Sequence, residues 1–114
     1  MHLYGLKTCD SCRAALKALR ATGRQVGFTD LRAEGISAED LARFHAAFGA
    51  ALINRRSTTW RGLSESERAS DPLHLLAAHP TLMKRPVIEV DGTLYLGWGP
   101  DQRAALLGNG AQTA

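Results

Sequence analysis

The two cysteines of this chain, Cys9 and Cys12, are separated by two residues in a C-x-x-C motif. An apolar segment precedes them and a helical pattern follows, which places Cys9 at a helix N-terminus. Unpaired backbone N–H groups and the positive end of the helix dipole stabilise an anion there, so we expect the Cys9 thiol to be acidic. Cys12 lies one turn further on, within disulfide reach. The pair therefore has the arrangement of a redox-active dithiol.

A zinc site is the main alternative for a C-x-x-C motif, and it needs two further ligands. His74 and His79 are five residues apart on one expected helix, so they face different sides of it, and they lie far from Cys12 in sequence. A lone C-x-x-C beside a β-α-β pattern in an intracellular chain is typical of thioredoxin-like redox motifs. We therefore expect redox chemistry and no metal.

The elements around the cysteines follow a β-α-β order. A short strand over 3–6 leads through a loop into a helix of about 11–21, and Cys12 falls on its apolar face with Ala15, Leu16 and Leu19. Cys12 should thus point inward while Cys9 stays exposed at the helix tip. A glycine at 23 ends the helix, and a second strand over 25–29 should pair in parallel with the first.

The rest of the chain predicts a helical block and then a hairpin with a final helix. Helix starts are indicated by Ser37 with Asp40, Ser64 with Glu67, and Asp71 before a proline. Period-two segments over 87–90 and 93–96 flank Asp-Gly, which favours a type I′ turn, and Pro100 can open a helix that stops at Gly108.

The expected fold class is therefore α/β, a thioredoxin-like fold with a mixed four-stranded sheet. A helical insertion over about 37–80 separates its β-α-β and β-β-α halves. We expect one domain over 1–108 and a flexible tail over 109–114.

Composition narrows the function classes. The chain has 114 residues with a formal net charge of +3, and its arginines are scattered rather than gathered on one helix face. We therefore do not expect nucleic-acid binding. No segment approaches the roughly 18 apolar residues that span a membrane, and two cysteines suit a reducing compartment. A monomeric cytoplasmic protein is the expectation.

Three segments together resemble the ArsC/Spx family in order and spacing: 3–12, 52–61 and 79–87. The central segment looks most like the small reductase-like bacterial members of that family. The resemblance implies a thioredoxin fold with a helical insertion, Cys9 as the nucleophile, and a cis peptide at Arg85-Pro86 facing the cysteines. Pro86 would be structural at the site. Without the resemblance we would expect a trans peptide, because only about 5–6% of X-Pro bonds are cis.

The resemblance also implies two anion-binding arginines. Arg85 would hold an oxyanion or carboxylate and help keep Cys9 as a thiolate, and Arg56 matches an arginine of the reductase-like and Spx members. Taken without the family, both are ordinary surface arginines. Arsenate reductases of the family use three arginines, and here one position falls at Asn54 while another falls in 96–99, which holds no basic residue. Arsenate is therefore not the first expected substrate.

The sequence thus predicts a glutaredoxin-like thiol-disulfide reductase in which Cys9 attacks and Cys12 resolves. No bound cofactor is expected, and electrons would come from glutathione or from a thioredoxin or glutaredoxin system. Expected partners are glutathione or another small thiol, disulfide or oxyanion, and a redox protein. Two alternatives stay open: an arsenate reductase, and an Spx-like redox-switched regulator that binds RNA polymerase.

Overall fold

The structure is a computed structural model that describes residues 1–107. The chain forms two compact units, one built from Met1–Asp30 with the chain from Arg85 onward, and one from Leu31–Lys84. The second unit begins earlier and ends later than the insertion expected over 37–80. The expected tail over 109–114 and the expected helix stop at Gly108 lie outside the described residues.

The first unit holds a four-stranded sheet in the order β2-β1-β3-β4. β1 runs parallel to β2 and antiparallel to β3, and β3 runs antiparallel to β4. The mixed α/β sheet predicted from the sequence is confirmed. The strands are β1 (His2–Gly5), β2 (Gly27–Asp30), β3 (Val87–Val90) and β4 (Thr93–Leu96).

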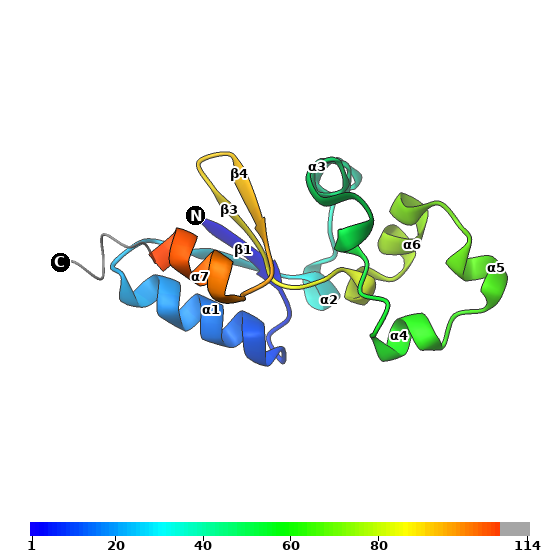
Figure 1. Cartoon of the computed structure of the whole chain (residues 1–114), viewed down its shortest axis with the longest axis horizontal. Helices are drawn as coiled ribbons and strands as arrows, with labels where there is room; N and C mark the ends of the chain where they lie inside the picture. Colours follow the sequence, from blue (N-terminus) through cyan, green and yellow to red (C-terminus); the bar gives the residue numbers. More distant parts are fainter. Residues whose placement is uncertain (108–114) are drawn as a thin grey trace. The chain divides into compact units, whose positions relative to one another are not determined.

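Helices α1 (Asp10–Ala21) and α7 (Pro100–Leu107) contact each other, and α1 also packs on β1. Figure 1 shows the two helices side by side along one face of the sheet. The core between them is a cluster of buried apolar side chains: Leu3, Cys12, Ala15, Leu19, Val26, Ile88 and Leu106. Cys12 therefore lies on the inner face of α1, as the spacing predicted.

The turn between β3 and β4 is of type I′. Asp91 has φ 50° and Gly92 has φ 82°, so both central residues take the left-handed conformation that this turn requires. Asparagine, aspartate and glycine tolerate that conformation better than other residues. The hairpin predicted from Asp-Gly is confirmed.

Strand β2 begins two residues later than expected and includes Asp30. Pairing with the first strand starts where the Gly27 N–H donates to the Met1 carbonyl at 3.0 Å, and Gly27 is in register with His2. Val26 is buried but precedes the ladder. The strand is thus defined by its partner rather than by its own apolar residues.

The second unit is helical. Its helices are α2 (Leu31–Glu34), α3 (Ala38–Phe48), α4 (Thr58–Arg61), α5 (Glu65–Arg68) and α6 (Pro72–Ala78), with 3-10 turns η1 (Gly49–Leu52) and η2 (Pro80–Leu82). Helix α3 packs on α6, and α6 packs on η2. Phe44 is fully buried, and a bridge between Ile53 and Met83 joins distant parts of the unit. None of the helices described over 1–107 is long and apolar enough to traverse a bilayer.

The helix caps of the second unit follow the sequence with one exception. At α5, Ser64 and Glu67 exchange both bonds of a capping box. At α3, the Ser37 side chain accepts the Asp40 N–H, but the Asp40 carboxylate binds Arg43 at 2.8 Å instead of turning back. The Ser37–Asp40 pair therefore marks the helix start as expected but forms only one of the two bonds of a capping box, because aspartate is one methylene shorter than glutamate.

Candidate redox site

Cys9 is the N-cap residue of α1, with the extended angles φ −83° and ψ 121°. Its carbonyl accepts the Arg13 N–H at 2.9 Å and its own N–H donates to the Leu6 carbonyl at 3.1 Å. The helix begins at Asp10, one residue earlier than expected. Cys9 is half-buried rather than fully exposed, because it also packs against the apolar core.

The pKa of the Cys9 thiol lies below its ordinary value. Burial acts in the opposite direction, but it is outweighed by groups that stabilise the thiolate: a backbone hydrogen bond and a thiol hydrogen bond from Cys12, and a hydrogen bond and positive charge from Arg85. A thiolate is the reactive form of cysteine. Cys9 therefore has the environment of a nucleophile.

Cys12 has the opposite environment, although it is one turn away. Its side chain is only 1% exposed. The pKa of the Cys12 thiol is raised to about 12, mainly by burial and also by the neighbouring Cys9, while a backbone hydrogen bond from Leu6 and the charge of Arg85 act in the opposite direction. The thiol is therefore protonated at neutral pH, and it can donate a hydrogen bond to a Cys9 thiolate.

Gly5 allows this close packing, and sequence reasoning did not identify it. A Cβ at Gly5 would overlap the Cys12 Sγ atom, so only glycine at the end of β1 lets α1 approach the strand this closely. An isolated glycine within a strand pattern was the signal available in the sequence.

Asp30 is a second site residue that sequence reasoning missed. Its side chain is 7% exposed, and its Oδ2 atom accepts the Lys7 N–H at 3.0 Å. Asp30 is also in register with Gly5. The contact fixes the start of the loop that leads from β1 to Cys9. Nothing in the sequence distinguishes this aspartate from a solvated one at a strand end.

The peptide between Arg85 and Pro86 is cis, as the family resemblance implied. Pro86 is buried, and its carbonyl accepts the Gly97 N–H at 2.7 Å, which ties the start of β3 to the end of β4. Arg85 is half-buried and reaches Cys9. The structure thus brings Cys9, Cys12 and Arg85 together in the first unit.

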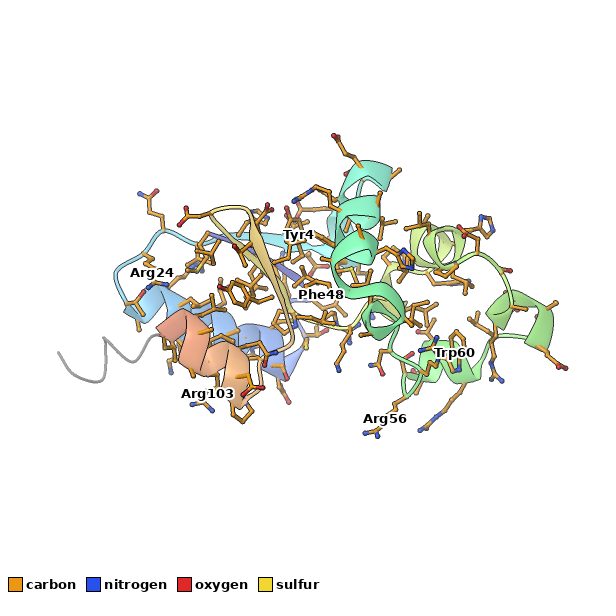
Figure 2. All side chains as sticks on the ribbon, turned by 45° about the horizontal axis from the view of Figure 1, so that its top comes forward. Tyr4, Arg24, Phe48, Arg56, Trp60 and Arg103 are labelled. Atoms are coloured by element: carbon orange, nitrogen blue, oxygen red, sulfur yellow. The ribbon has the colours of Figure 1, made fainter. Side chains whose placement is uncertain are left out.

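Arg56 belongs to the second unit, where its side chain is exposed and points outward (Figure 2). Its N–H donates to Asn54 Oδ1 at 3.0 Å, and both residues line a surface hollow of about 440 Å³ that Arg55 and Lys84 also line. A role for Arg56 toward the cysteines stays a prediction. Across residues 1–107, no three histidine, cysteine or acidic side chains gather in a way that could hold a metal ion.

Comparison with known proteins identifies similar chains. A sequence model of the ArsC family matches residues 4–106. An uncharacterized protein of Haemophilus influenzae is 37% identical over 108 residues, which are 90% of this chain and 95% of the relative. These matches cover both units.

Solved structures also include chains that are similar to this one. The YFFB protein is 37% identical with a TM-score of 0.85, over 94% of this chain and 98% of that one. An arsenate reductase related protein from Brucella melitensis is 38% identical with a TM-score of 0.70, over 91% of each chain. An arsenate reductase from Vibrio cholerae has a TM-score of 0.73 at 22% identity, over 94% of this chain and 98% of that one, which shows a shared fold.

Proposed function

The chain belongs to the ArsC family, and we propose that it is a glutaredoxin-like thiol-disulfide reductase that works through Cys9 and Cys12. The observation that carries the proposal is the contrast within one helical turn. Cys9 is half-buried with a lowered pKa, and Cys12 is buried with a pKa raised to about 12. The Cys9 thiol is thereby suited to attack a substrate, and the Cys12 thiol to resolve the mixed disulfide afterwards.

The proposed reaction has two steps. The Cys9 thiolate attacks one sulfur of a substrate disulfide, which breaks the substrate S–S bond, forms a mixed disulfide on Cys9 and releases a thiolate. The Cys12 thiol then gives its proton to the thiolate released in the first step and attacks the Cys9 Sγ atom, which breaks the mixed disulfide and releases the second half of the substrate as a thiolate. Two electrons pass to the substrate, and the cysteines become a disulfide.

The same steps explain why Cys12 becomes reactive only after Cys9. While Cys9 is a thiolate, its charge and hydrogen bond raise the pKa of Cys12. These two contributions vanish when Cys9 enters the neutral mixed disulfide, whereas the favourable charge of Arg85 remains. The Cys12 pKa therefore falls at the moment when its thiolate is needed.

We propose glutathione, or a thioredoxin or glutaredoxin system, as the source of the electrons that reopen the disulfide. Arg85, with Arg56 as a second candidate, would hold a carboxylate of a glutathione-linked substrate. Two free cysteines suit the reducing cytoplasm, which is the compartment we propose.

Arsenate reduction is the second candidate, and the similarity to an arsenate reductase related protein at 38% identity favours it. The residue composition favours it less. Asn54 and the segment 96–99 supply no positive charge where arsenate reductases of the family have arginines. Each lost charge-assisted hydrogen bond costs about 1.5–3 kcal/mol, so arsenate should bind weakly.

Turnover of the purified, reduced protein tests the proposal. A mixed disulfide of glutathione and a small thiol is compared with arsenate, in the presence of glutathione, NADPH and glutathione reductase, and Cys9→Ser serves as the inactive control. We expect NADPH consumption with the mixed disulfide and little with arsenate. Faster turnover of arsenate would support the second candidate. No turnover of either would exclude both and favour the redox-switched regulator.

A further inference from the structure

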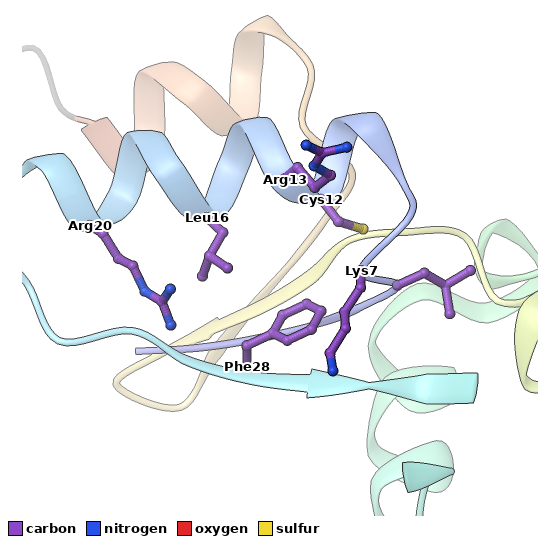
Figure 3. Close-up of a pocket in the computed structure, with 7 residues that line it drawn as sticks. Lys7, Cys12, Arg13, Leu16, Arg20 and Phe28 are labelled. Carbon is purple, nitrogen blue, oxygen red and sulfur yellow. The ribbon is translucent and has the colours of Figure 1, made fainter. Parts of the chain in front are cut away.

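A cavity of about 270 Å³ lies between α1 and β2, next to the redox pair. Its wall is mainly apolar and includes Leu6, Leu16 and Phe28, together with Cys12. Figure 3 shows the Leu16 side chain on α1 facing the Phe28 ring on β2. Leu16 and Phe28 are only partly buried, so part of this apolar surface meets solvent inside the hollow.

Three cations surround the same cavity: Lys7, Arg13 and Arg20. Arg20 donates one hydrogen bond to the Val26 carbonyl at 3.0 Å, which holds it beside the hollow with further N–H donors unused by that bond. In Figure 3, Lys7 and Arg20 lie on either side of Phe28. No acidic side chain lines the cavity. The hollow thus combines an apolar wall with a rim of three cations.

We propose that this cavity binds a small carboxylate that carries an aromatic ring. The Phe28 ring offers an aromatic partner in the offset or edge-to-face arrangements that such rings favour, and Leu16 supplies aliphatic contact. The carboxylate is placed at the rim, where charge-assisted hydrogen bonds to lysine or arginine are stronger than neutral ones. Pockets for small ligands share this composition of apolar walls with a few polar groups.

The inference does not require the proposed reductase activity, because binding is measured without turnover. The reduced, ¹⁵N-labelled full chain is titrated with 3-phenylpropionate at constant pH and ionic strength, and backbone amide shifts are followed by NMR. We expect saturable shifts at Leu6, Leu16 and Phe28. The neutral 3-phenylpropionamide lacks the charge, and acetate lacks the ring. Each should bind at least about tenfold more weakly than 3-phenylpropionate, the first for want of one charge-assisted contact and the second for want of the ring contacts.

Matched double variants test the contribution of the rim. Lys7→Ala/Arg13→Ala removes two exposed cations of the cavity, and Lys17→Ala/Arg103→Ala removes two exposed cations elsewhere in the same unit. We expect about a tenfold loss of affinity for 3-phenylpropionate in the first and no change in the second, with similar thermal midpoints. Equal binding of the amide or of acetate, equal losses in both variants, or shifts that do not saturate would each overturn the proposal.

Discussion

At the scale of single residues, the two cysteines differ because their surroundings differ. Both lie at the first turn of α1, where the helix dipole favours a thiolate. Cys12 is turned into the core and carries the cost of desolvation, whereas Cys9 caps the helix and reaches Arg85. Position along the helix and direction of the side chain together separate their chemistry.

This separation predicts the pH dependence of alkylation. In Cys12→Ser, the Cys9 rate with iodoacetamide should rise with a midpoint below that of a free cysteine, because its pKa is lowered. In Cys9→Ser, the Cys12 rate should still be rising far above that pH, because burial keeps its pKa raised without Cys9. Stopped-flow alkylation across the pH range measures both midpoints. Coincident midpoints would contradict the assignment of Cys9 as the nucleophile.

Arg85 should control the pKa and reactivity of Cys9 without being needed for folding. Arg85→Ala removes a hydrogen bond and a charge that lower the Cys9 pKa, so the pKa should rise. At a pH below the Cys9 pKa of both the wild type and the variant, the alkylation rate should fall roughly threefold for each unit by which the Cys9 pKa rises. The fall is less than tenfold because a thiolate of higher pKa is more nucleophilic, which partly compensates for the smaller fraction of thiolate. Lys84→Ala removes a neighbouring exposed cation and is the matched control. Equal effects of the two variants would return Arg85 to an ordinary surface arginine.

At the scale of elements, the site depends on how closely α1 approaches the strand before it. The loop between them is held by the bond from the Lys7 N–H to Asp30, and the contact surface is formed by Gly5 and Cys12. Glycine leaves room for a sulfur atom at this position. The helix therefore meets β1 with Cys12 pressed against the backbone.

Gly5→Ala should destabilise the protein by about 1–3 kcal/mol, which is the usual cost of overpacking a core. The added methyl group would overlap Cys12 Sγ, and Gly5→Ala/Cys12→Ala should recover part of the loss because the sulfur is gone. Gly62→Ala is the control, since its Cβ would meet only atoms at 3.5 Å or beyond with φ −80°. Denaturant unfolding of the reduced proteins measures the differences. An unchanged midpoint in Gly5→Ala would show that α1 moves away at little cost.

At the scale of the whole molecule, the prediction from the sequence is a monomer. No large hydrophobic side chain is exposed among the described residues. Stable protein interfaces usually have an apolar, well-packed centre. The folded chain does not present one within residues 1–107.

We therefore expect a monomer. Sedimentation velocity of the reduced protein at micromolar concentration should give one species with the mass of one chain, and the profile should not change with concentration. The measurement is repeated on Cys9→Ser/Cys12→Ser, which removes both thiols and so excludes disulfide-linked species. A dimer that persists in this double variant would contradict the expectation.

Much of this protein follows from local patterns in its sequence. The C-x-x-C motif at a helix start, the inward spacing of Cys12, the Asp-Gly hairpin and the capping box of Ser64 with Glu67 each depend on residues close together in the chain. Backbone sterics, helix periodicity and local hydrogen bonds act over such distances, so these features were predictable. The order of strands and helices then led to the mixed sheet.

Tertiary contacts decided the rest. The beginning of β2 at Gly27 depends on pairing with β1, and the cis peptide before Pro86 had to be carried over from a family. The approach of Arg85 to Cys9 and the bond from Lys7 to Asp30 join residues far apart in sequence. The acidic Cys9 thiol was expected from its place at the helix N-terminus. Burial and long-range charge exist only once the chain is folded, which is why the contribution of Arg85 to the Cys9 pKa and the size of the rise in the Cys12 pKa required the structure.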